Sequence, residues 1–145
     1  MQIDNATFKA LMNDGISAQG DLLIVRRDLL GATREGWEVV VSTLGGRHVV
    51  AHSETGHHHV LGGYTPPGGL LANMTLKHPN LWRNPKLPAD QQEIRSIVEV
   101  PADSLGEIVH MRETHRHETH ILPPGEWVLI RQQRPTPEGW RVVAD

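Results

Sequence analysis

Eight of the ten histidines in this 145-residue sequence fall in two short clusters that resemble each other. The first cluster occupies residues 51–61 and has the sequence AHSETGHHHVL, and the second occupies residues 110–122 and has the sequence HMRETHRHETHIL. In both clusters, Glu-Thr is followed by a His-x-His pair and then by aliphatic residues. Imidazole is the side chain best suited to bind Zn, Fe, Ni or Cu near neutral pH when no thiol is present. Since the chain has no cysteine, these histidines and nearby carboxylates are the natural ligands for a transition metal.

The spacing within each cluster predicts that pairs of imidazoles share one face of a strand. Residues two apart in a β-strand point to the same side, so His57 projects with His59 and His115 projects with His117. If the two strands lie side by side, these four imidazoles surround one point, which suits a tetrahedral or an open octahedral site. We therefore expect a divalent transition metal, with Zn or Fe ahead of Ni or Cu. The predicted ligands, including further candidates from the same clusters, are His57, His59, His115, His117, His52, His120 and Glu118.

The histidines also have plainer interpretations. A lone surface histidine usually has no specific role, and we assign this interpretation to His48, His78 and His110. For the two clusters, the alternative to a metal site is a solvated group of histidines that titrates near neutral pH.

Familiar enzyme signatures do not match the sequence. A zincin needs His-Glu-x-x-His on one helix face, whereas residues 117–120 have one residue too few between the histidines. Neither cluster matches the first cupin motif, no Gly-x-Ser-x-Gly elbow is present, and a cysteine nucleophile is impossible. We therefore predict no catalytic residues and favour a non-enzymatic protein.

Composition narrows the classes of partner. The net charge is −3 and no run of basic residues stands out, so we expect no nucleic-acid partner. No apolar stretch approaches the roughly 20 residues needed to cross a bilayer, so we expect no membrane partner. The N-terminus has neither a charged region nor an apolar region typical of a signal peptide. These features predict a virion or cytoplasmic location and no secretion by a signal peptide.

The distribution of apolar runs predicts an all-β protein. Short β-branched runs alternate with Gly-rich turns along most of the chain, which is typical of a single β-sandwich or small barrel, jelly-roll-like. One domain spans residues 1–145, and residues 1–19 form a short N-terminal helix or an arm that orders only on a partner. A Pro-Pro-Gly turn at residues 123–125 predicts that the second histidine cluster and the strand beginning at Trp127 are antiparallel neighbours.

The middle of the chain has a different composition. Residues 62–92 are rich in proline and glycine, and we expect a long central loop with one possible strand at residues 70–76. A loop of this length is usually a binding loop or an excursion between subunits. Trp82, next to Arg83, is either an interface anchor or a cap on the core. This loop is the main reason to expect a homo-oligomer or a larger assembly.

Several stretches resemble a known group of proteins. Residues 49–60 resemble a pattern in small histidine-rich proteins of tailed phages and prophages, some of them encoded near capsid genes. So do His-Glu-Thr and Leu-Pro-Pro-Gly in residues 117–125, together with residues 131–134 and 137–141. The resemblance covers residues 20–61 and 105–145, and it implies a virion-associated or phage accessory protein. The positions that match the pattern are His57, His59, His117 and Glu118.

These observations lead to one favoured function and two alternatives. We expect a non-enzymatic structural protein, associated with a phage virion or capsid as a decoration or cement protein, whose histidine clusters bind metal. Its partners are then further copies of itself or a capsid protein. The alternatives are a cupin-like metal-dependent enzyme with an open coordination position, and a metal-binding accessory or regulatory module.

Overall fold

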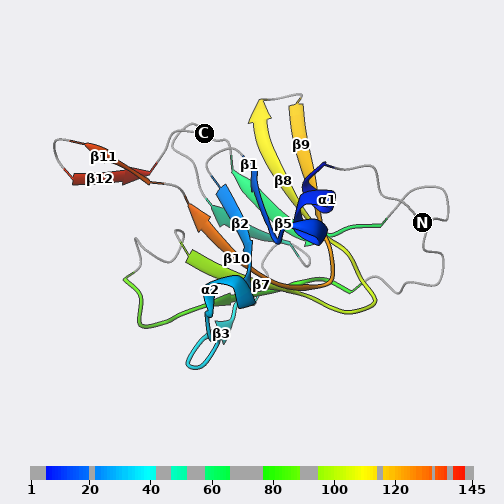
Figure 1. The fold of residues 1–145 in the computed structure, drawn as a ribbon, viewed down its shortest axis with the longest axis horizontal. Helices are drawn as coiled ribbons and strands as arrows, with labels where there is room; N and C mark the ends of the chain where they lie inside the picture. Colours follow the sequence, from blue (N-terminus) through cyan, green and yellow to red (C-terminus); the bar gives the residue numbers. More distant parts are fainter. Residues whose placement is uncertain are drawn as a thin grey trace.

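The fold was analysed in a computed structural model of the chain (Figure 1). It describes residues 6–19, 22–41, 47–51, 58–65, 77–88, 95–113, 116–131, 133–136 and 139–142, with residues 19, 51, 111–113, 116–118, 133–136 and 139–142 described for their backbone alone. The elements are α1 (Ala6–Asn13), β1 (Ile16–Gln19), β2 (Leu22–Arg26), α2 (Arg27–Leu30), β3 (Glu38–Val39), β4 (His48–Ala51), β5 (His59–Gly63), β6 (Asn80–Arg83), β7 (Arg95–Val100), β8 (Gly106–Glu113), β9 (Arg116–Leu122), β10 (Gly125–Arg131), β11 (Gln133–Thr136) and β12 (Gly139–Val142).

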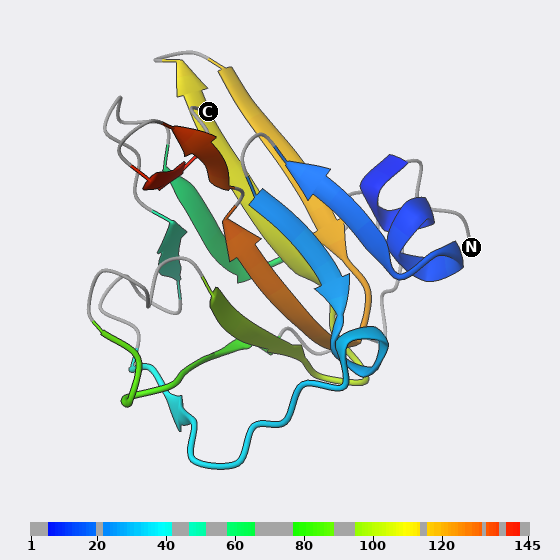
Figure 2. The same ribbon diagram turned by 60° about the vertical axis from the view of Figure 1, so that its left-hand side comes forward.

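The strands form two antiparallel sheets and a separate hairpin. The larger sheet has the order β1-β2-β10-β7-β6-β3, the smaller sheet has the order β4-β5-β8-β9, and β11 pairs with β12. Figure 2 shows β2, β10 and β7 in one layer with β5, β8 and β9 in a second layer behind them. The fold is therefore all-β and sandwich-like with a short N-terminal helix, as the sequence predicts.

Buried and more exposed side chains alternate along parts of the strands, and the buried ones form a core between the two sheets. In β2, Leu22 and Ile24 are almost fully buried and face the interior, because residues two apart share one face of a strand. Burying an aliphatic side chain of this size contributes about 1.5–3 kcal/mol. The core draws on both sheets and on α1: Leu11, Leu22, Ile24, Val50, Leu61, Leu81, Val98, Val100, Ile108, Leu122, Trp127 and Leu129.

Helix α1 lies between the edge strands of the two sheets. It contacts β1 at the edge of the larger sheet and β9 at the edge of the smaller one (Figure 1). Leu11 is 1% exposed and belongs to the core, and the helix ends at Asn13, two residues before Gly15, which has φ 73°. Of the expected N-terminal helix or arm (residues 1–19), the described residues thus form a helix packed on its own sandwich and, after it, the edge strand β1.

The segment that follows β2 crosses the outer face of the larger sheet. Arg34 forms ion pairs with Glu99 (3.1 Å) and with Glu126 (2.8 Å), and its guanidinium lies 4.4 Å from the ring centroid of Trp82. Glu99 and Glu126 are direct cross-strand partners, a position in which like charges repel. Arg34 therefore neutralises an unfavourable pair and ties the crossing segment to the sheet.

Two expectations about the middle and the end of the chain need correction. Strand β6 lies inside residues 62–92, between β7 and β3, so part of the expected loop is a sheet strand; residues 70–76 lie outside the described part. Strand β9 does not pair with β10: it pairs with β8, while β10 pairs with β2 and β7. The Pro-Pro-Gly turn therefore carries the chain from one sheet to the other.

The packing of α1 yields a test of its structural role. Replacing Leu11 by Ala should lower the free energy of unfolding by about 2–5 kcal/mol, because it leaves a cavity between the sheets. The matched control is Met12→Ala in the same helix, where the side chain is 58% exposed and the expected change is within about 0.5 kcal/mol. Urea unfolding followed by circular dichroism measures both. Equal effects of the two substitutions would mean that α1 is not part of the core.

Candidate functional site

The two histidine clusters meet at one end of the four-stranded sheet. Strand β5 begins at His59, its antiparallel neighbour β8 passes His110 near its end, and β9 begins at Arg116. His59 lies directly opposite His110, and His110 lies directly opposite Glu118. The clusters are therefore brought together, but β8 lies between β5 and β9, which the sequence did not predict.

The rings of His59 and His110 stack against each other inside the protein. Their centroids are 4.1 Å apart, the ring planes differ by 9°, and each residue is 1% exposed. The lone pair of an imidazole nitrogen lies in the ring plane, so parallel rings do not aim two nitrogens at one point. In this arrangement a metal would take one nitrogen from the stack and its other ligands from neighbouring residues.

Four described histidines lie on the core-facing side of this sheet. His48 is opposite Leu61 and His120 is opposite Ile108, and both histidines are 8% exposed. The expectation that His48 and His110 are surface residues is wrong, whereas His78 is exposed. The signal was present in the sequence, because each misassigned histidine stands two positions from an aliphatic residue of the buried face.

His120 is held by the N-terminal helix. Its Nδ1 lies 2.7 Å from the hydroxyl oxygen of Thr7, and both side chains are buried. This hydrogen bond joins α1 to β9 and occupies one ring nitrogen of a predicted ligand. His120 therefore has a structural role in addition to the ligand role that its position in the cluster suggests.

The remaining predicted ligands are placed only in part. His52, His57 and His115 lie outside the described residues. The backbone of Glu118 is opposite His110, whereas that of His117 is opposite Met111, in the adjacent row of the sheet. Within the described ranges, three or more His, Asp or Glu side chains do not gather in a group able to hold a metal, so the shared four-histidine site stays a prediction.

The pKa of His48 is lowered by burial and by neighbouring charges. Burial is the largest cause that lowers the pKa of His48 below its ordinary value, and the charges of Arg83 and His78 lower it further. The neutral imidazole is therefore the favoured form of His48 in the folded protein, because protonation would place a further positive charge beside Arg83.

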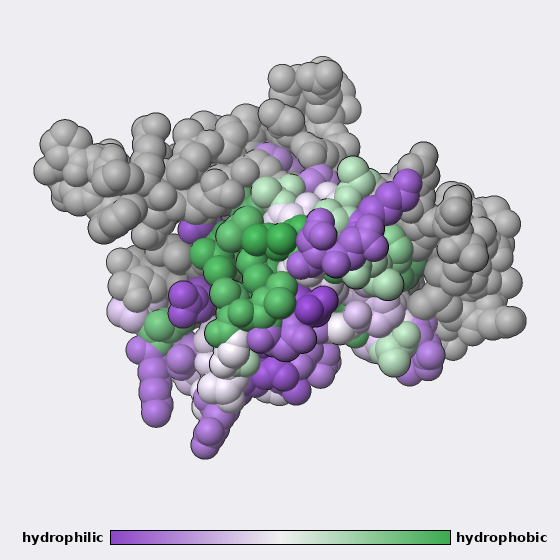
Figure 3. Space-filling model, viewed as in Figure 1, coloured by the Kyte–Doolittle hydropathy of each residue, from purple (hydrophilic) through white to green (hydrophobic). Residues whose placement is uncertain are grey.

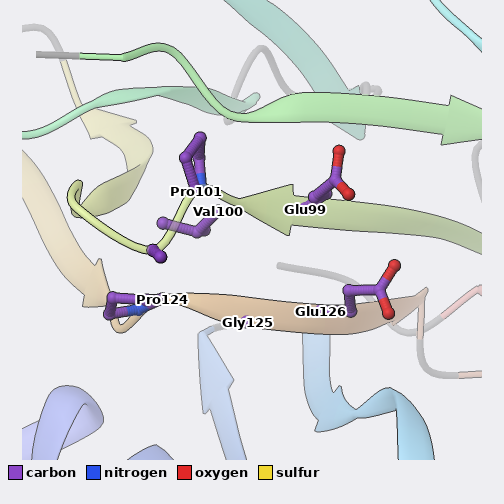
Figure 4. Close-up of a pocket in the computed structure, with 7 residues that line it drawn as sticks. Glu99, Val100, Pro101, Pro124, Gly125 and Glu126 are labelled. Carbon is purple, nitrogen blue, oxygen red and sulfur yellow. The ribbon is translucent and has the colours of Figure 1, made fainter.

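A pocket lies away from the predicted ligands, between the end of β7 and the start of β10. It has a volume of about 600 Å³ and is lined by residues 99–102 and 124–126. In Figure 4, Pro101 and Pro124 form one side while the carboxylates of Glu99 and Glu126 project from the neighbouring strands. Both carboxylates already pair with Arg34, and Glu126 also pairs with Arg27. Arginines of the same chain therefore already balance the negative charge of these two carboxylates.

The Thr7–His120 hydrogen bond can be tested by an isosteric substitution. Thr7→Val should lower the free energy of unfolding by about 1–3 kcal/mol, because Nδ1 of His120 loses this buried partner. Thr33→Val is the control, since the hydroxyl of Thr33 accepts a hydrogen bond from the backbone N–H of Glu35 at an exposed position. Chemical denaturation of both variants measures the difference, and a Thr7→Val effect no larger than the control would contradict a stabilising role.

The lowered pKa of His48 predicts a pH dependence of stability. The unfolded side chain takes up a proton near its ordinary pKa of 6.5, whereas the folded one resists protonation until lower pH. The stabilising contribution is therefore complete above about pH 6.5 and is lost as the pH falls from there towards the folded pKa. Unfolding free energies of the parent and of His48→Gln between pH 7.5 and 5 should diverge, with the steeper acid loss in the parent. Parallel curves would show that His48 does not titrate differently on folding.

A family model matches most of the chain. It covers residues 18–132, which include both histidine clusters and strands β2 to β10. A search of the curated proteins finds no match, and a search of solved structures also finds none. Among the described helices, none has the length and apolar character needed to span a membrane. The extent of the match shows that the chain belongs to the family described as Domain of unknown function (DUF8820).

Proposed function

We propose that this protein is a non-enzymatic structural protein that binds a divalent transition metal where its histidine clusters meet. The observation that carries the proposal is the row His59–His110–Glu118 across β5, β8 and β9. It brings two imidazole positions and one carboxylate position from distant parts of the sequence to one end of a sheet. Zn and Fe are the first candidates and Ni and Cu the alternatives, since all four bind imidazole.

The row contains both imidazoles and a carboxylate, two kinds of group that act together in metal sites. Neutral imidazole binds the metal through one nitrogen and donates its other N–H to a carboxylate or carbonyl, which orients the ring. Glu118 is the proposed carboxylate, either as a ligand or as this acceptor. His57, two residues before His59, and His115 of the second cluster are further proposed ligands. His117 is left out of this set, because its backbone lies in the adjacent row and neighbouring residues of a strand face opposite sides.

The proposed metal adds stability to a fold that does not depend on it. Apolar residues from both sheets and from α1 already form a common core, and a chain of 145 residues is long enough to bury one without a metal. A ligand that binds only the folded state adds about 2.7 kcal/mol at a hundred times its dissociation constant. A metal that stabilises the folded chain in this way would be useful to a structural protein of an assembly, which must stay folded.

The resemblance to small phage proteins extends the proposal to a virion-associated decoration or cement protein. Figure 3 shows apolar side chains gathered on one face in the region of β1, β2 and α2. Exposed aliphatic residues of these elements include Ile16, Leu29 and Leu30, each between 44% and 52% exposed. A contiguous apolar patch on a surface is typical of a protein interface, so this face supports assembly with copies of the same chain or with a capsid protein.

Metal binding is tested by substitutions within the row. Tag-free His59→Asn and Glu118→Gln should each bind Zn at least about tenfold more weakly than the parent, the usual cost of losing a ligand or its orienting partner. His78→Asn is the control, because His78 is exposed and lies outside both clusters. Calorimetric titration gives the affinity and elemental analysis gives the stoichiometry. Parent-like values for both row variants would rule out this site.

Removal of metal provides a separate test of the structural role. Chelation with EDTA should lower the melting temperature while the β-type circular dichroism spectrum at room temperature is retained, because the core is formed without metal. Added Zn should then restore the melting temperature. Complete unfolding by EDTA at room temperature, or no change in melting temperature, would contradict a stabilising metal in a self-sufficient fold.

A further inference from the structure

A second polar site lies between the sheets, where β4 faces β6. Arg83 is in β6 of the larger sheet, and its Nη2 donates a hydrogen bond of 3.2 Å to the backbone carbonyl of Val49 in β4 of the smaller sheet. The guanidinium therefore spans the gap between the two sheets. His48, the residue before Val49, is buried on the core-facing side of the same strand.

Among the described residues, Arg83 has a buried donor without an acceptor and forms no ion pair. Nε of Arg83 is buried and makes no hydrogen bond, and the ion pairs of the described residues do not include Arg83. Glu38 is its direct cross-strand partner, but Glu38 is exposed and forms no ion pair with it. A guanidinium stays charged at every relevant pH, and a buried donor without an acceptor costs about 1–3 kcal/mol. The described residues thus supply no acceptor for Nε of Arg83 and no carboxylate paired with its charge.

His48 adds a polar side chain beside Arg83, because Arg83 binds the carbonyl of the next residue, Val49. The charges of Arg83 and His78 both act on His48 and disfavour its protonation. A neutral imidazole retains one N–H donor. An entering anion would therefore meet the fork of Arg83 and a second donor from His48.

We propose that Arg83 and His48 form a binding site for a small oxyanion, a carboxylate or a phosphate. Nε and a terminal nitrogen of Arg83 would donate hydrogen bonds to two oxygens of the anion, because the planar guanidinium matches the geometry of carboxylate and phosphate. His48 would donate to a third position. The anion is either free phosphate or the carboxylate of a peptide or metabolite. The site uses no residue of the two histidine clusters and stands independently of the proposed metal function.

The probes are inorganic phosphate and acetate, added at constant ionic strength to the full chain after metal has been removed with EDTA and the EDTA has been dialysed away. Nitrogen-15 NMR should show the Nε–H resonance of Arg83 shifting and saturating with at least one anion at millimolar concentration. The Arg83→Gln variant should bind that anion at least about tenfold more weakly, the loss expected for a charge-assisted hydrogen bond. Arg95→Gln, at an exposed position on β7, is the control and should bind like the parent.

The two anions distinguish the sources of the ligand. Saturation by phosphate alone assigns the site to free phosphate, and saturation by acetate assigns it to carboxylates. If neither anion shifts the Nε–H resonance of the parent, or if Arg83→Gln binds as the parent does, the proposal is wrong. The resonance of the parent decides the question even if Arg83→Gln does not fold.

Discussion

Imidazoles occupy positions on the inner face of the smaller sheet where a sandwich normally needs apolar side chains. A polar group is costly to bury unless it has partners, and much of the architecture around this face provides them. His59 and His110 stack on each other, and Thr7 of α1 bonds His120. The helix that closes the gap between the two edge strands is thus also the helix that satisfies a buried histidine. Stability and the proposed chemistry depend on the same cross-strand register.

On the larger sheet, some charged side chains are balanced by other charged side chains of the same chain. On its outer face, Arg34 neutralises the opposed carboxylates of Glu99 and Glu126 and covers the ring of Trp82. Those charges are balanced within the fold. For the imidazole row and for Arg83, by contrast, we propose ligands from outside the chain. The two proposed sites differ in sign, one suited to a cation and the other to an anion.

The sequence predicts the class of fold well, because short β-branched runs between glycine-rich turns have few other uses. The sequence also predicts that the strands of the two clusters lie side by side, and described residues of both clusters do lie at one end of a sheet. It does not predict that β8 lies between β5 and β9, since strand order depends on pairings between residues far apart in the chain. The stacking of His59 on His110 depends on the same distant pairings, whereas the burial of His110 is indicated by Ile108, two residues before it. Residues 123–125 were mistaken for a hairpin because a tight turn and a crossing between sheets have similar compositions.

Anomalous X-ray scattering at the zinc absorption edge is the most direct test of the metal site. Crystals of tag-free protein grown with one equivalent of Zn should give a single strong peak about 2.0–2.1 Å from a ring nitrogen of His59 or His110. The other ligands should come from the two histidine clusters. The absence of a peak at this end of the four-stranded sheet, or Zn bound only at an exposed histidine such as His78, would contradict the proposed site.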